Sequence, residues 1–278
     1  MGLKSKLKHI VSFLLHGETR PVVAHITYLQ ADRQLEGKKI IITGGGKGIG
    51  YAMAKKFKAA GADVLISGRD ETKLKVAANE IGCSYLTLDV RDTESFESFI
   101  DDANRILGGA NCLVNNAGIS LHENGFLNVQ EEQFDSQFDT NLKGAFFLTQ
   151  SFLKKRLETK QDEINKVLFI SSETGMTADE RPYGLTKAAL NSLVQGIAYR
   201  YVNEGFRINA LAPGVTVTDM VDKQDDGNLY CSYGITKRYY LPGEVAEVAS
   251  FLLSDASNCI NGQIINCNEG KTINARWK

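Results

Sequence analysis

The stretch IIITGGGKGIG, residues 40–50, joins a short run of β-branched residues to a glycine-rich turn and to the start of a helical segment. Such a run predicts a buried strand, because isoleucine and threonine pack well on a pleated sheet. Glycine lets backbone amides and a helix N-terminus approach a phosphate group closely. The glycines at positions 44, 48 and 50 depart from the usual Gly-x-Gly-x-x-Gly spacing, so the turn alone is also compatible with a purely structural role. The stretch therefore predicts a strand–turn–helix unit with a candidate phosphate-binding loop.

Short apolar runs and helical lengths alternate along the rest of the chain. Further runs lie at residues 64–67, 85–88, 112–114, 167–170, 208–211 and 264–265, and helical lengths include 50–60, 71–81, 95–107 and 182–203. This alternation is typical of βαβ units that form a parallel sheet covered on both faces. We therefore expect an α/β fold of the Rossmann type, a doubly wound parallel sheet that binds ligands at the carboxyl ends of its strands.

The chain has 278 residues, 43% of them hydrophobic, which is enough for one large domain. We expect a domain over residues 37–278, with a long loop or lid at about 219–240, after an extension over residues 1–36. The extension has one apolar stripe typical of an amphipathic helix, formed by Leu3, Leu7, Ile10, Leu14 and Leu15. Packing on the body or on a neighbouring subunit is the favoured role of this helix, and peripheral membrane contact is the alternative.

Charge and cysteine usage narrow the classes of function. A net charge of −1 argues against nucleic acid as a partner, because phosphate binding needs a concentrated basic surface. The five cysteines are scattered and lack metal-ligand spacing, so neither disulfides nor a metal site are predicted. A reducing cytoplasm is the expected location.

The end of the second predicted strand bears on cofactor choice. A NAD-selective site would place a carboxylate there to accept from the ribose 2′-hydroxyl. This chain has Arg69 instead, and Lys47 lies in the glycine loop. Together they are suited to a 2′-phosphate, which a carboxylate would repel. Asp70 is the rival, but its place before a helical segment suits an N-cap. The pattern favours NADP(H).

A tyrosine precedes a lysine by four positions at three places: Tyr51 and Lys55, Tyr183 and Lys187, and Tyr233 and Lys237. On a helix this spacing places both side chains on one face. Tyr51 follows the glycine loop, where packing is expected, and Tyr233 lies in the predicted lid. Tyr183 begins a long helix after a strand that ends in two serines, so its context selects this pair.

Several motifs occur together in a fixed order: TGGGKGIG at 43–50, LDV at 88–90, NNAG at 115–118, NLKG at 141–144, SS at 171–172, YGLTK at 183–187 and PGVTVTDM at 213–220. Each motif alone is weak. In this order, from about residue 38 to residue 272, the chain resembles the short-chain dehydrogenase/reductase family, including its 3-oxoacyl-carrier-protein reductase-like members.

The resemblance implies a catalytic tetrad of Asn141, Ser172, Tyr183 and Lys187. Tyr183 would donate its phenolic proton to a carbonyl oxygen as hydride arrives from the nicotinamide. Its pKa, ordinarily about 10, would be lowered by Lys187 and by the oxidised, cationic nicotinamide. Ser172 would hydrogen-bond the substrate oxygen, and Asn141 would hold a water that connects Lys187 to solvent.

The resemblance also implies which residues contact the cofactor. Asp89 would accept from the adenine amino group, the backbone near Val90 would contact the ring, and Thr216 and Thr218 would orient the carboxamide. The full implied set is Gly44, Gly46, Lys47, Gly48, Ile49, Gly50, Arg69, Asp89, Val90, Asn115, Asn116, Ala117, Gly118, Tyr183, Lys187, Pro213, Gly214, Thr216 and Thr218.

The chain departs from the family pattern at two places. Ser172 lies 11 residues before Tyr183, fewer than is common, which leaves Ser171 as an alternative for the substrate-facing serine. Ser172 is preferred because Gly175 follows it at the family's Ser-x-x-Gly spacing. Near the end, NCNEG at 266–270 replaces the usual Asp-Gly-Gly.

The expected function is an NADPH-dependent reduction of a carbonyl to a secondary alcohol, with a 3-oxoacyl thioester as one candidate substrate. For a carrier-protein substrate, Lys237 and Arg238 are the basic residues expected at the mouth of the site. A sugar or polyol dehydrogenase and a non-catalytic NADP(H) sensor are the alternatives. A homodimer or homotetramer is expected through helices at about 131–157 and 182–203.

Overall fold

The structure is a computed structural model that describes residues 33–159, 163–221, 227–232 and 234–273. The predicted N-terminal helix lies outside the described residues, as do Tyr233 and residues 222–226 of the predicted loop or lid. Leu35, at the described start of the chain, is fully buried, and its backbone N–H donates to the carbonyl of Ala60. The chain therefore joins the core before the first strand begins.

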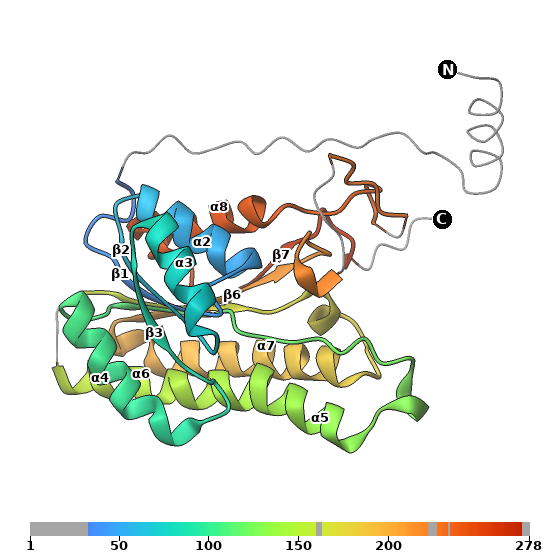
Figure 1. Cartoon of the computed structure of the whole chain (residues 1–278), viewed down its shortest axis with the longest axis horizontal. Coiled ribbons are helices and arrows are strands. Elements are labelled where there is room, and N and C mark those ends of the chain that lie inside the picture. The colour runs from blue at the N-terminus through green and yellow to red at the C-terminus, as the bar shows by residue number, and fades with distance from the viewer. Residues whose placement is uncertain (1–32, 160–162, 222–226, 233, 274–278) are drawn as a thin grey trace.

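Seven parallel strands form one sheet, as the alternation of runs predicts (Figure 1). They are β1 (Lys39–Thr43), β2 (Asp63–Gly68), β3 (Ser84–Thr87), β4 (Cys112–Asn115), β5 (Asn165–Ile170), β6 (Phe206–Pro213) and β7 (Ile264–Cys267). Their order in the sheet is β3-β2-β1-β4-β5-β6-β7. The doubly wound parallel sheet expected from the sequence is confirmed.

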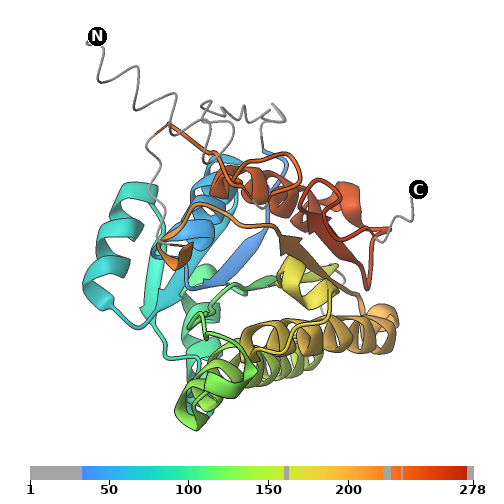
Figure 2. The ribbon, with the colours of Figure 1, turned by 90° about the vertical axis from the view of Figure 1, so that its right-hand side faces the viewer.

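Helices cover both faces of the sheet. One layer contains α2 (Gly48–Ala59), α3 (Glu71–Ile81) and α8 (Pro242–Leu253), and the other contains α4 (Phe96–Leu107), α5 (Glu131–Phe138), α6 (Gly144–Thr159) and α7 (Pro182–Tyr201) (Figures 1 and 2). Ile40 and Ile42 pack in the core under α2 and α8, whereas Ile41 packs in the core under α4 and α6. Successive side chains of a strand point to opposite faces, so β1, an interior strand, contributes to both cores. No helix of the described residues has the length and apolar character that crossing a bilayer requires.

The helix predicted over 131–157 is wrong in one respect, because a π-helical turn at Asp139–Lys143 separates α5 from α6. Gly144 follows this turn, and a Cβ there would lie 2.2 Å from the carbonyl oxygen of Val90. The backbone after β3 therefore presses directly on the start of α6. Single π-turns of this kind are frequently found at functional sites.

The strand order reverses between β1 and β4, and the loops that follow these strands are joined by hydrogen bonds. The Thr43 hydroxyl accepts from the backbone N–H groups of Asn116 and Ala117, both at 3.0 Å. The Asn116 side-chain amide donates to the carbonyls of Thr43 at 2.9 Å and Gly44 at 3.1 Å. These hydrogen bonds therefore join the two loops at the position where such sheets bind ligands.

Candidate active site

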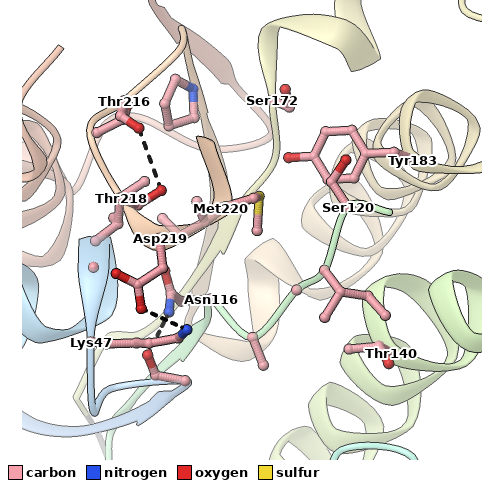
Figure 3. A pocket seen from close by; sticks show the side chains of 18 of the residues that line it. Lys47, Asn116, Ser120, Thr140, Ser172, Tyr183, Thr216, Thr218, Asp219 and Met220 are labelled. Atoms are coloured by element: carbon pink, nitrogen blue, oxygen red, sulfur yellow. Dashed lines mark hydrogen bonds and ion pairs between the residues drawn. The ribbon is translucent and has the colours of Figure 1, made fainter. Parts of the chain in front are cut away.

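A cavity of about 1110 Å³ opens at the carboxyl ends of the strands. Its lining comes from the glycine loop after β1 and from the segments that follow the other six strands, with the start of α7 (Figure 3). These segments are far apart in the sequence, and the parallel sheet brings their ends to one edge. The cavity is therefore at the place expected for the ligand of a doubly wound sheet.

The glycine loop has a shape that side chains would prevent. Gly44 and Gly48 have φ angles of +65° and +56°, a region that favours glycine. A Cβ at Gly50 would lie 2.2 Å from the carbonyl oxygen of Gly44. The first turn of α2 can thus pack against the loop, so the N-terminus of this helix borders the cavity. Backbone N–H groups at such a helix N-terminus attract anions.

Most of the predicted cofactor residues line this one cavity. They are Gly44, Gly46, Lys47, Gly48, Ile49, Arg69, Asp89, Val90, Asn116, Ala117, Gly118, Tyr183, Lys187, Pro213, Gly214, Thr216 and Thr218. Gly50 and Asn115 do not belong to the lining. Gly50 packs behind the loop, and the buried Asn115 amide donates to the Thr149 hydroxyl at 2.8 Å. These two residues support the cavity from outside.

The end of β2 contributes one cation and one helix cap. Arg69 is exposed and lines the cavity. The Asp70 carboxylate accepts from the backbone N–H of Lys73 at 3.1 Å and caps α3, which confirms the predicted N-cap. This hydrogen bond holds the pKa of Asp70 below its ordinary value. The carboxylate nearest the end of β2 is therefore engaged by its own helix.

Two ion pairs involve predicted cofactor residues. Lys47 Nζ lies 2.9 Å from the carboxylate of Asp219, which comes from the segment after β6 (Figure 3). Both side chains are largely exposed, so a bound anion can compete for Lys47. The carboxylate of Asp89 accepts from the guanidinium of Arg91, with the shorter contact at 2.6 Å. Arg91 was not predicted, and a basic residue two positions after Asp89 is the signal that could have identified it.

Ser172, Tyr183 and Lys187 gather around one region of the cavity, where Ser172 and Tyr183 face each other (Figure 3). Tyr183 and Lys187 lie one turn apart on α7, and Lys187 Nζ is 5.5 Å from the centre of the Tyr183 ring. Lys187 is 4% exposed and donates to the carbonyl of Ile170 at 2.8 Å. The tyrosine and lysine selected by sequence context are therefore adjacent in space.

The two serines after β5 have different surroundings. Ser171 Oγ donates to the Asn191 side chain at 2.7 Å, so it is engaged with α7. Ser172 Oγ accepts from the backbone N–H and the hydroxyl of Thr174, and its side chain faces the phenol of Tyr183 (Figure 3). A Cβ at Gly175 would lie 2.7 Å from the backbone of Lys187, which explains the Ser-x-x-Gly spacing. Of the two alternatives left by the sequence, Ser172 faces Tyr183.

The electrostatics differ from the sequence expectation in one respect. In the chain by itself, burial raises the pKa of Tyr183, the hydrogen bond with Ser172 opposes this, and the charge of Glu173 adds to it. Burial lowers the pKa of Lys187 to about 8. The pKa of Tyr183 is thus raised in the chain by itself, and the expected lowering requires further positive charge beside that of Lys187, such as a cationic nicotinamide.

Asn141 lies in the π-turn and is almost fully buried. Its side-chain oxygen accepts from the backbone N–H of Ile119 at 2.8 Å, and its amide donates to the Ile119 carbonyl at 2.9 Å. A Cβ at Gly118 would lie 3.3 Å from the Asn141 oxygen and 3.6 Å from Lys187 Nζ. Asn141 thus clamps the loop after β4 beside Lys187, and its predicted water stays a prediction.

Other tyrosine and lysine pairs have different roles. The Tyr51 hydroxyl donates to the Glu80 carboxylate at 3.0 Å on the surface. Tyr233 lies outside the described residues.

Arg238, predicted at the mouth as a contact for a carrier protein, is instead held by Glu244 at 2.7 Å and Glu269 at 2.8 Å, with 14% of its side chain exposed. The positive charge of Arg238 is therefore largely neutralised by these two carboxylates.

Sequence reasoning missed several residues of the lining around Ser172, among them Leu121, Glu123, Glu173, Arg181, Met220 and Lys271. Glu173 follows Ser172 directly, and Arg181 precedes Tyr183 by two positions, so proximity to the motifs was an available signal. Lys271 lies near the C-terminus, and no local pattern links it to the site.

Comparisons with known proteins agree with this geometry. The model of a protein family described as enoyl-(acyl carrier protein) reductase matches residues 44–272. The oxidoreductase UcpA of Salmonella typhimurium is 33% identical over 259 residues, which cover 86% of this chain and 96% of that protein. The 3-oxoacyl-acyl-carrier-protein reductase FabG of Aquifex aeolicus is 31% identical over 247 residues, which cover 85% of this chain and 98% of that protein.

A solved structure has the same fold. The crystal structure of a short-chain type dehydrogenase/reductase from Mycobacterium marinum matches with a TM-score of 0.78 at 28% identity, covering 86% of this chain and 97% of that chain. The matched residues include the glycine loop, Ser172, Tyr183 and Lys187, all of which contribute to the cavity lining. The chain therefore belongs to the short-chain dehydrogenase/reductase family of oxidoreductases.

Proposed function

We propose that this protein is an NADPH-dependent carbonyl reductase that uses Tyr183 as its proton donor. The observation that carries the proposal is the meeting of Ser172, Tyr183 and Lys187 in the cavity that the glycine loop and Arg69 also line. The nicotinamide supplies a hydride when the cofactor is bound. Because cells generally keep the NADP pool reduced, reduction is the proposed direction.

The residues present fit a dinucleotide. Gly44, Gly46 and Gly48 line the cavity without side chains, so the backbone of the glycine loop can approach a bound phosphate closely. Arg69 and Lys47 offer two cations where a 2′-phosphate is expected, and Asp70 is engaged as the cap of α3. These features support NADP(H) over NAD(H).

The chemistry assigned to the chain is acid catalysis and alignment of the substrate. Ser172 donates a hydrogen bond to the carbonyl oxygen, and Tyr183 transfers its phenolic proton to that oxygen as negative charge develops. Lys187, 5.5 Å from the Tyr183 ring centre, supplies positive charge beside the phenol. Asn141 fixes the loop that borders Lys187.

The experiment that tests the function measures oxidation of NADPH by the purified protein with acyl thioesters, keto-sugars and simple ketones. Turnover of one class supports the proposal and names the substrate. The relative named 3-oxoacyl-acyl-carrier-protein reductase supports acyl thioesters as the first class to examine. Tight NADPH binding without turnover of any carbonyl would instead favour a non-catalytic sensor.

A homo-oligomer is part of the proposal. Large apolar side chains are exposed on α5, α6 and α7, namely Phe134, Phe146, Phe147, Leu157, Leu185 and Tyr199. Such a concentration of exposed apolar groups is typical of an interface.

All five cysteines are free, which supports a reducing compartment such as the cytoplasm.

Replacing Arg69 with alanine should weaken NADPH binding by roughly tenfold to a hundredfold and leave NADH binding nearly unchanged. A hydrogen-bonded ion pair to a phosphate is worth about 1.5–3 kcal/mol, and NADH lacks this phosphate. The measurement is the dissociation constant of each cofactor by fluorescence titration. Lys75→Ala, which removes an exposed charge from α3 outside the cavity lining, is the control. Equal weakening of both cofactors would contradict the assigned contact.

A further inference from the structure

Glu173 is a buried carboxylate beside the catalytic serine, and the chemistry proposed above does not use it. It begins a 3₁₀ turn (Glu173–Met176) directly after Ser172, is 7% exposed and lines the cavity. A buried carboxylate is unfavourable unless it is paired. The groups that pair with Glu173 therefore affect the electrostatics beside Ser172.

Both oxygens of Glu173 contact the turn that follows β7. Lys271 Nζ donates to Oε1 at 2.6 Å, and the Asn268 side-chain amide donates to Oε2 at a longer 3.4 Å. Ninety-eight residues separate Glu173 from Lys271 in the sequence. The C-terminal turn thus contacts the segment that carries the catalytic serine.

The turn itself is held in shape by Asn268, which is fully buried. Its side-chain oxygen accepts from the backbone N–H of Gly270 at 3.2 Å, and its amide also donates to the Thr272 hydroxyl at 3.1 Å. The backbone N–H of Lys271 donates to the Asn268 carbonyl at 3.1 Å. Lys271 therefore extends from a closed turn, and this turn begins with the last three residues of the sequence NCNEG, which departs from the family pattern.

The charge of Glu173 acts on Tyr183. After burial, which raises the pKa of Tyr183 most, and the opposing hydrogen bond of Ser172, the negative charge of Glu173 raises this pKa further. A positive charge on Lys271 beside Glu173 compensates part of that effect. Other charged or titratable groups surround this region. The cavity lining includes Lys187, His122 and Glu123, together with Arg181, which pairs with Asp179. Tyr240, whose pKa the charge of Glu173 also raises, lies beside the pair of Glu269 and Arg238.

We propose that Lys271 is a positioning residue of the active site, which acts through its ion pair with Glu173. The pair neutralises the carboxylate next to Ser172 and holds the 3₁₀ turn in the place where Ser172 meets Tyr183. This inference rests on the proposed function, because it assigns Lys271 a role in preparing Tyr183 for proton transfer. It makes the C-terminal turn part of the reductase site.

The test is a set of charge-removing variants of the full chain, read by the titration of Tyr183. For each variant, phenolate absorbance is followed with pH and the same variant carrying Tyr183→Phe is subtracted, so that the difference reports Tyr183 alone. Lys271→Met should raise the midpoint by about one pH unit, because Glu173 is left without its cation. Glu173→Gln should lower the midpoint, because the negative charge that raises the pKa of Tyr183 is then removed.

Removal of both charges and conservative replacement complete the test. The double variant should return the midpoint to near the wild-type value, and Lys271→Arg should retain it. The alkaline limb of the pH profile of kcat should move in the same direction as each midpoint. Lys155→Met is the matched control, because Lys155 forms an ion pair of the same 2.6 Å length with Asp101 on α4 and is exposed to a similar degree.

The outcomes separate this inference from the proposed function. Unchanged midpoints in Lys271→Met and Glu173→Gln would overturn the inference even if the protein reduces carbonyls. The expected opposite shifts would support it even if no carbonyl is reduced, because the titration needs no turnover. If Lys271→Met does not fold, Lys271→Gln, which removes the charge and keeps an amide donor, should give the same upward shift and decides the question. A loss of stability without any shift would mean that the pair is merely structural.

Discussion

Replacing Tyr183 with phenylalanine should lower kcat for NADPH-dependent carbonyl reduction by roughly a hundredfold to ten-thousandfold. The substitution removes the hydroxyl that we propose as the proton donor and keeps the ring, so the packing of α7 is preserved. Ser172 Oγ keeps its two hydrogen bonds from Thr174. NADPH binding should therefore change little. The measurement is kcat with the best carbonyl of the substrate screen, together with a fluorescence titration of NADPH.

The matched control for this prediction is Tyr51→Phe. Tyr51 also precedes a lysine by four positions, but its hydroxyl donates to Glu80 on the surface. Its loss should leave turnover unchanged. If Tyr183→Phe retained full turnover, the proton would come from another group and the proposed mechanism would be wrong. If both variants lost turnover equally, the effect would lie in the fold and not in the chemistry.

Replacing Gly50 with alanine should weaken NADPH binding by about a hundredfold, because the glycine loop must move to accept one methyl group. The added Cβ would lie 2.2 Å from the carbonyl oxygen of Gly44 and 2.5 Å from the side-chain nitrogen of Asn116. Neither neighbour is the free end of a flexible chain, since Asn116 is hydrogen-bonded to Thr43 and Gly44. The free energy of unfolding should also fall, by about 1–3 kcal/mol.

The same substitution at Gly196 should change the free energy of unfolding in the opposite direction. A Cβ at Gly196, in the exposed part of α7, meets no atom within 4 Å. Gly196→Ala should therefore raise the free energy of unfolding by about 0.5–1 kcal/mol, because alanine is the better helix former. Urea unfolding and NADPH titration measure both variants. Similar stability and affinity for the two variants would contradict the close packing of the glycine loop.

Local pattern predicted much of the fold. Each apolar run named from the sequence forms a strand of the sheet, and 71–81 is a helix with the predicted bounds. These elements depend on residues close together in the chain, so side-chain periodicity and turn residues suffice to identify them. The interruption of the helix at 139–143 escaped this reasoning. Gly144, which follows this turn, packs closely against the backbone of Val90, and a contact between residues so far apart in the chain leaves no local signal.

The residues of the site also divide into those that local sequence placed and those that needed the structure. Tyr183 and Lys187 share one helix, so their spacing was enough to place them together. The choice between Ser171 and Ser172 needed the structure, because it depends on which hydroxyl α7 engages. The side chain of Asn141 also had no local signal for its contact with Ile119.

By itself, the sequence determined the α/β class, the glycine loop and the tyrosine and lysine pair, because each is encoded by neighbouring residues. Only the tertiary structure decided the strand order, the orientation of Ser172 and the contact of Lys271 with Glu173. Such contacts join residues that are distant along the chain, and they arise only when the sheet brings the ends of separate strands to one edge. For this reason the groups proposed to perform the chemistry were visible in the sequence, whereas the contact proposed to tune them, between Glu173 and Lys271, was not.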